Sequence, residues 1–121
     1  MVRIAVIHGP NRNLLGLREP EIYGGDDLTR IDLKLQELAK RENMELRITQ
    51  SNHEGELVEA IHAALGWAQA LVINPAAYTH TSVAIRDAIE RIEDTEALKN
   101  CVAVFADRGY SNFYTRLSDL L

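Results

Sequence analysis

The 121-residue chain has a single cysteine, Cys101, and no excess of basic residues. One thiol cannot form an intramolecular disulfide or supply a multi-cysteine zinc site, and the apolar residues around it predict a buried structural side chain. Lysine and arginine together number 13, against 18 aspartate and glutamate residues, for a formal net charge of −5. This balance argues against a non-specific nucleic-acid binder, which normally presents a strongly basic face.

Long apolar runs are also absent, since no stretch approaches the roughly 20 residues needed to cross a bilayer. The N-terminus has a short apolar segment and no positively charged leader followed by a cleavage site. We therefore expect no membrane partner and a cytoplasmic location. The glycines match neither a P-loop nor the dinucleotide fingerprint, and no Cys/His/Asp spacing indicates a metal site, so we expect neither a bound nucleotide nor a metal.

What the chain does contain is the balance of an ordinary globular protein, with 46% hydrophobic and 26% charged residues. This composition excludes wholesale disorder and collagen-like sequence. The length is close to the modal size of one compact domain. Because no repeat, low-complexity tract or linker divides the chain, we predict a single domain over residues 1–121.

Four short apolar runs predict β-strands. Three of them are nearly continuous, as is typical of parallel strands covered on both faces: Ile4 to Ile7, Ala70 to Ile73 and Cys101 to Ala106. In the remaining run Met44, Leu46 and Ile48 alternate with polar residues. That alternation predicts a strand with one wetter face at the edge of the sheet.

Apolar residues at helical spacing separate these runs. The three stripes comprise Leu28, Ile31, Leu35 and Leu38; then Leu57, Ile61 and Leu65; then Ile85, Ala88, Ile89 and Ile92. Asp27 and Asn52 are the expected N-caps of the first two helices. Strands that alternate with helices predict an α/β fold with a doubly wound parallel sheet, and an outer position for the alternating run predicts the strand order 2-1-3-4.

Two segments depart from this regular pattern. The segment from His8 to Asp26 is rich in Gly, Pro, Asn and Arg, and connections longer than about 12 residues are usually functional or disordered. After the last apolar run only residues 108–121 remain, which suffice for one short helix. An exposed apolar edge strand invites association, so we predict a homo-oligomer.

Ligands of open α/β sheets bind beyond the carboxyl ends of the strands, and polar segments follow three of the predicted ends. Arg18 and Tyr23 are the main catalytic candidates there, because a nearby guanidinium lowers the pKa of a phenol and makes it a base. A packed tyrosine beside a solvated arginine is the alternative interpretation. His80, where the third helix should begin, either binds a substrate hydroxyl or has a capping role.

Long strings of the sequence resemble the type II 3-dehydroquinate dehydratases, or dehydroquinases. The matching strings are Gly9 to Asn11, Asn13 to Gly16, Arg18 to Gly24, Gln50 to Glu56, Ile73 to Pro75 and Tyr78 to Ala88. The resemblance covers about residues 1–92. It implies a flavodoxin-like fold, trimers assembled into dodecamers, no cofactor, and conversion of the small-molecule substrate 3-dehydroquinate to 3-dehydroshikimate. It thereby places the chain among lyases of the shikimate pathway and aromatic amino acid biosynthesis.

The resemblance also implies roles for individual residues. Tyr23 is similar to the phenolate base that removes a proton beside the ketone, with Arg18 lowering its pKa. Asn11 resembles the residue that stabilises the enolate through a water molecule. Such proton abstraction needs both a matched base and stabilisation of the developing oxyanion. Further residues match positions that bind substrate: Asn74, His80, Arg116, and Asp87 toward the site of a neighbouring subunit.

The C-terminal quarter departs from the family pattern, which includes a fifth strand and a last helix that this sequence lacks. Phe105 stands where the family has the histidine that protonates the leaving hydroxyl. Asp107 replaces a serine near the substrate carboxylate, where like charges repel. His8 replaces a family asparagine and is a candidate substitute acid; a polar replacement without a catalytic role is the alternative. General acid catalysis contributes typically ~10²–10⁴-fold, so its loss predicts a very slow dehydratase.

Three functions therefore stay open from the sequence. The chain is a dehydroquinase-type lyase, a diverged relative that acts on another cyclic hydroxyketone, or a non-catalytic ligand-binding or interaction protein on the same scaffold. The matching strings favour the lyase.

Overall fold

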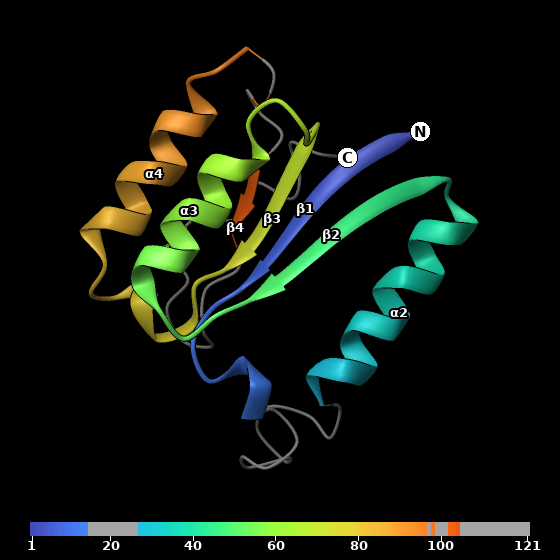
Figure 1. The fold of residues 1–121 in the computed structure, drawn as a ribbon, viewed down its shortest axis with the longest axis horizontal. Coiled ribbons are helices and arrows are strands. Elements are labelled where there is room, and N and C mark those ends of the chain that lie inside the picture. Colours follow the sequence, from blue (N-terminus) through green and yellow to red (C-terminus); the bar gives the residue numbers. More distant parts are fainter. Residues whose placement is uncertain (15–26, 97, 99–101, 105–121) are drawn as a thin grey trace.

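The computed structural model of the chain describes residues 1–14, 27–96, 98 and 102–104. These residues form a parallel sheet with helices on both faces (Figure 1). The predicted α/β class with a parallel sheet is thereby confirmed. No helix in the described ranges has the length and apolar character that a membrane span requires.

Four strands build the sheet in the order β2-β1-β3-β4. Their bounds are Val2–His8 for β1, Met44–Gln50 for β2, Ala70–Asn74 for β3 and Val102–Val104 for β4. All the pairs are parallel, and residue Val6 of β1 lies opposite Ile48 of β2 and Val72 of β3. All strands therefore present their carboxyl ends at one edge of the sheet.

Within the described ranges, three α-helices and two short 3-10 helices connect the strands. Their bounds are Arg12–Leu14 for η1, Leu28–Arg41 for α2, Glu54–Ala64 for α3, Ala76–Thr79 for η2 and Val83–Glu93 for α4. Helices α3 and α4 pack side by side on one face of the sheet, and α2 lies on the other (Figure 1). The two faces are consequently covered to different extents.

The main core lies between the sheet and the α3/α4 pair. Alternate residues of the two central strands point to this face and are joined by buried side chains of the helices: Ala5, Ile7, Leu71, Ile73, Leu57, Ile61, Ile85, Ala88, Ile89 and Ile92. The predicted stripes of these two helices supply most of the helical contribution. Burial of such aliphatic side chains stabilises the fold by roughly 1.5–3 kcal/mol each.

The helix termini confirm one predicted cap and correct another. Asp27 is the N-cap of α2, where its carboxylate accepts a hydrogen bond from the backbone N–H of Arg30 at 2.8 Å. The prediction of Asn52 as the cap of α3 is wrong, because the N-cap is His53, whose side chain makes no capping bond. The Asn52 side chain instead accepts a hydrogen bond from the backbone N–H of Asn11, across the site.

The C-terminus of α3 corrects a second detail. Leu65, expected on the buried stripe of this helix, is its C-cap and is 45% exposed. Gly66 follows with a φ of 78°, a left-handed conformation that commonly ends helices. The chain therefore turns away before Leu65 can reach the core.

Candidate active site

The carboxyl ends of β1 and β3 bring two predicted site residues next to each other. His8 and Asn74 are register partners, so their side chains lie on the same face of the sheet, the one that α2 covers. Just beyond them the backbone N–H of Gly9 donates to the carbonyl of Asn74 at 2.8 Å. Sequence positions 66 residues apart thus meet at one edge through backbone pairing.

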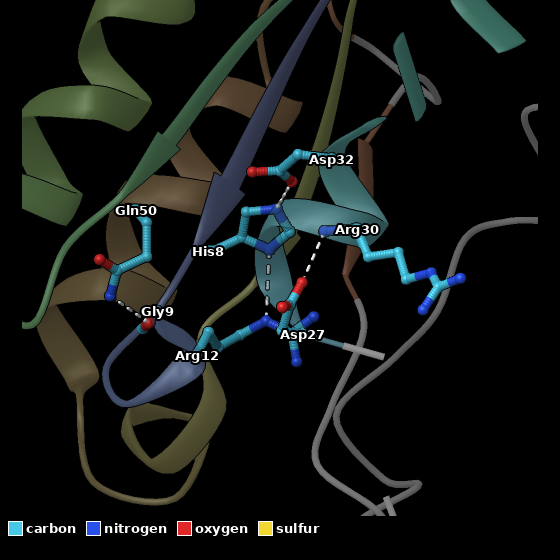
Figure 2. A network of polar contacts seen from close by, with 7 residues as sticks. All are labelled: His8, Gly9, Arg12, Asp27, Arg30, Asp32 and Gln50. Atoms are coloured by element: carbon cyan, nitrogen blue, oxygen red, sulfur yellow. Dashed lines mark hydrogen bonds and ion pairs between the residues drawn. The ribbon is translucent and has the colours of Figure 1, made fainter. Parts of the chain in front are cut away.

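A chain of three side chains crosses this edge from α2 to η1 (Figure 2). The Nε2 atom of His8 lies 2.9 Å from the Oδ1 atom of Asp32, and the Arg12 Nε–H donates to Nδ1 of the same imidazole at 3.2 Å. His8 itself is buried, with 4% of its surface exposed. Both ring nitrogens of the imidazole are therefore engaged by other side chains.

These contacts define the protonation state of His8. Because Arg12 donates to Nδ1, that nitrogen carries no hydrogen, and Nε2 is the donor to Asp32. Burial lowers the pKa of His8 below its ordinary value of 6.5, the Arg12 charge lowers the pKa further, and Asp32 opposes both effects. The structure thus holds a neutral imidazole at neutral pH.

The lowered pKa predicts acid sensitivity that passes through His8. The unfolded chain takes up a proton on this residue as the pH falls below 6.5, whereas the folded chain takes it up only at a lower pH. Unfolding therefore becomes more favourable across that window, and the loss ends once both states are protonated. We expect the urea midpoint of the wild type to fall between about pH 7.5 and about pH 5.5 by more than that of His8→Asn. An equal fall in the two proteins would contradict this assignment.

A cluster of amide side chains lies beside the imidazole at the end of β2. Nε2 of Gln50 donates to the Gly9 carbonyl at 3.2 Å and to Oδ1 of Asn52 at 3.2 Å. The same Asn52 oxygen accepts from the backbone N–H of Asn11 at 2.9 Å. Asn11 has a φ of 65°, so these bonds hold it in the left-handed region that few residues adopt. The position of Asn11 is thereby set by Asn52, which follows β2 and is bonded in turn by Gln50 at the end of that strand.

The remaining predicted residues follow β3. Asn74 accepts a hydrogen bond from the backbone N–H of Ala76 through its Oδ1 atom, at 2.9 Å. His80 is the exposed C-cap of η2, a few residues farther along the same connection. Asp87 lies on the exposed surface of α4, where it pairs with Arg91 at 3.4 Å. Sheet pairing therefore brings together His8 and Asn74, and Asp87 faces solvent on another element.

Several predicted residues lie outside the part of the chain that the structure describes. They are Arg18, Tyr23, Cys101, Phe105, Asp107 and Arg116. Within the described ranges, no three His, Cys, Asp or Glu side chains gather in a group that could hold a metal ion.

Two residues of the site were missed by sequence reasoning, although each left a signal. Arg12 interrupts an otherwise continuous match between Asn11 and Asn13. Asp32 is four residues after Leu28 and three before Leu35, so it puts a carboxylate on the apolar stripe of α2. A charged residue on a sheet-facing stripe indicates a buried partner.

A cavity of about 390 Å³ opens at the same edge, between α2 and the sheet. Val6, Leu35 and Val72 contribute apolar wall, whereas polar groups come from three residues: His8, Arg12 and Asn74. A few convergent polar groups on an apolar wall are typical of sites for small organic ligands. The fold and this edge together define an α/β protein with a candidate small-molecule site at the carboxyl ends of its strands.

Comparison with known proteins identifies the family. The model of the family described as "Dehydroquinase class II" matches residues 2–103. A 3-dehydroquinate dehydratase of Gloeothece citriformis is 54% identical over 90 residues, which are 74% of this chain and 59% of that protein. A catabolic 3-dehydroquinase of Talaromyces marneffei is 54% identical over 89 residues, 74% of this chain and 51% of that protein.

The solved structures agree. The crystal structure of a type II dehydroquinase from Butyrivibrio crossotus aligns with a TM-score of 0.74 at 38% identity, covering 87% of this chain and 68% of that one. This chain belongs to the class II dehydroquinase family. It spans roughly half to three fifths of the length of the curated relatives described above.

Proposed function

We propose that this chain is a type II 3-dehydroquinate dehydratase that converts 3-dehydroquinate to 3-dehydroshikimate and water. The observation that carries the proposal is the convergence of Asn74 and the Gly9–Asn11 segment at one edge of the sheet, beside a cavity of about 390 Å³. These segments belong to the strings shared with the family. Identity of 54% to a 3-dehydroquinate dehydratase over 90 residues supports the same activity.

The proposed mechanism begins with removal of a proton beside the substrate ketone. Tyr23, as phenolate, takes that proton, and the Arg18 guanidinium stabilises the phenolate by its charge. The electron pair moves onto the ketone oxygen as an enolate, which Asn11 stabilises through a water molecule. Asn74, His80 and Arg116 bind the substrate.

The enolate then re-forms the ketone and expels the hydroxyl group, which leaves as water after it gains a proton from an acid. His8 was the sequence-based candidate for that acid. The neutral tautomer that Arg12 and Asp32 hold has no proton to donate at Nδ1. The geometry therefore favours a positioning role for His8 over that of the acid.

The proposal extends to architecture and assembly. The chain is a single flavodoxin-like domain over residues 1–121, with the strand order 2-1-3-4. It forms a homo-oligomer, either a trimer or a dodecamer assembled from trimers, in which Asp87 contacts the site of a neighbouring subunit. It works in the cytoplasm on a small-molecule substrate without a cofactor. The exposed position of Asp87, 56% accessible on α4, supports such a contact.

Two measurements on the purified chain test this function. Incubation with 3-dehydroquinate should raise the absorbance of the conjugated enone, because dehydration creates a double bond next to the ketone. The mass in solution should be that of a trimer or a dodecamer of the 13.6 kDa chain. Absorbance that stays at the level of a protein-free sample would refute the activity, and a monomer at micromolar concentration would refute the assembly.

A further inference from the structure

Arg12 is the cationic side chain on the wall of the cavity between α2 and the sheet. It lies on η1, directly after β1, and is half-buried. Its Nε–H donates to Nδ1 of His8 at 3.2 Å, and His8 in turn donates from Nε2 to Asp32 at 2.9 Å (Figure 2). Two successive hydrogen bonds thus tie the guanidinium group to α2 through a buried ring.

This arrangement restricts the orientation of the guanidinium plane. Arginine is otherwise a long side chain with many rotamers, and a ligand that must order it loses affinity. A bond at Nε fixes the plane and therefore the direction of the two terminal amino groups, which form the fork that matches a carboxylate. An arginine fixed in this way is suited to bind one carboxylate in one orientation.

The restriction depends on a neutral His8. Only an unprotonated Nδ1 can accept from Arg12, and a protonated ring would place a second positive charge 3.2 Å from that guanidinium. Burial, which lowers the pKa of His8, keeps the ring in the accepting state near neutral pH. Asp32 contacts the opposite nitrogen, so the imidazole ring separates its negative charge from Arg12.

The other walls of the cavity fit the rest of a hydroxylated cyclic acid. Val6, Leu35 and Val72 offer apolar surface to ring carbons, and Asn74 offers an amide to a hydroxyl group. The proposed substrate, 3-dehydroquinate, combines a ring, hydroxyl groups and one carboxylate. Arg12 supplies on this wall the positive charge with which that carboxylate pairs.

We propose that Arg12 binds the substrate carboxylate and that His8 and Asp32 are positioning residues that orient it. This inference rests on the proposed function for the identity of the substrate. It assigns the carboxylate to the β1 side of Asn74, next to η1.

The test compares two ligands that differ in one group, quinate, which has the carboxylate, and quinamide, its neutral carboxamide. Calorimetry on the full chain should give at least ~10-fold tighter binding of quinate, as expected for charge-assisted hydrogen bonds. In Arg12→Gln this preference should disappear, with the affinity for quinamide unchanged. Arg12→Lys, which keeps the charge and loses the fork, should retain part of the preference.

Two substitutions of His8 separate positioning from packing. The amide of His8→Asn can place an oxygen where Nδ1 lies, so it should keep most of the preference for quinate. The amide of His8→Gln reaches toward Asp32 and leaves no acceptor for Arg12, so the preference should fall as in Arg12→Gln. In the wild type the preference should also weaken once the pH is low enough to protonate the buried His8, whose pKa lies below 6.5, and in Arg12→Gln it should not depend on pH.

Each outcome decides the inference. Equal binding of quinate and quinamide by the wild type, no binding of either, or a preference that survives in Arg12→Gln would overturn it. Urea midpoints show whether each variant is folded. If Arg12→Gln does not fold, the preference for quinate over quinamide is compared between the wild type, Arg12→Lys and His8→Asn. A preference that depends on Arg12 without any enone signal from 3-dehydroquinate would refute the proposed reaction and leave the carboxylate site standing.

Discussion

Gly9→Ala should destabilise the protein by about 3 kcal/mol and abolish ligand binding. A Cβ atom at this position would lie 2.5 Å from the carbonyl oxygen of Pro75 and 2.9 Å from that of Asn74. Both neighbours are backbone atoms, so neither can rotate away. Relief of the clash requires separation of the ends of β1 and β3, which also breaks the 2.8 Å hydrogen bond from the Gly9 N–H to Asn74. Urea denaturation and quinate calorimetry measure the two effects.

Gly55→Ala is the matched control. Gly55 lies in the first turn of α3, and a Cβ atom there would meet nothing within 4 Å. Alanine is favoured over glycine in helices by up to about 1 kcal/mol, so this variant should be as stable as the wild type or slightly more stable. Equal stability of Gly9→Ala and Gly55→Ala would show that the two strand ends do not approach as closely as the structure indicates.

Tyr23→Phe should lower kcat for 3-dehydroquinate by at least ~10²-fold, because phenylalanine has no oxygen that can take a proton. The substitution removes one oxygen atom and leaves the ring, so quinate affinity should change little. This combination identifies a group that acts on the reacting proton rather than one that binds the ground state. Initial rates of enone formation, together with calorimetry, provide both numbers.

Tyr78→Phe makes the same chemical change at a site where no catalytic role is assigned. The Tyr78 hydroxyl donates to the carbonyl of Asn52 at 3.1 Å, so its loss should cost about 0.5–1.5 kcal/mol of stability. Its kcat should stay within a few fold of the wild type. If Tyr23→Phe keeps the parental rate, the phenolate mechanism is wrong, whatever the behaviour of Tyr78→Phe.

Much of the fold followed from local patterns. The continuous apolar runs predicted the central strands, and the structure extends the first of them to Val2–His8. The 3.6-residue stripes predicted the helices α2, α3 and α4, and Asp27 was identified as a cap because Asp is a strong N-cap residue. The same reasoning wrongly predicted Asn52 as the cap of α3. The Asn52 side chain binds the backbone of Asn11 instead, and this partner is too far away in the sequence for a local pattern to reveal it.

Less of the candidate site could be predicted from the sequence. His8 was noticed as a departure from the family pattern, but its partners Arg12 and Asp32 were not. Asp32 is 24 positions away and reaches the imidazole because α2 packs over the carboxyl end of β1. Because of those contacts His8 is a neutral hydrogen-bond acceptor rather than a candidate acid, and it orients the Arg12 guanidinium.

The order of residues along the chain was enough to specify which segments become strands and helices and to which family they belong. These properties depend on side-chain periodicity and on motifs within short stretches, where every interacting residue is a near neighbour. The ionisation of His8 and the direction of Arg12 depend instead on desolvation and on hydrogen bonds between β1, η1 and α2. Such interactions form only after these elements have packed, so only the tertiary structure shows them.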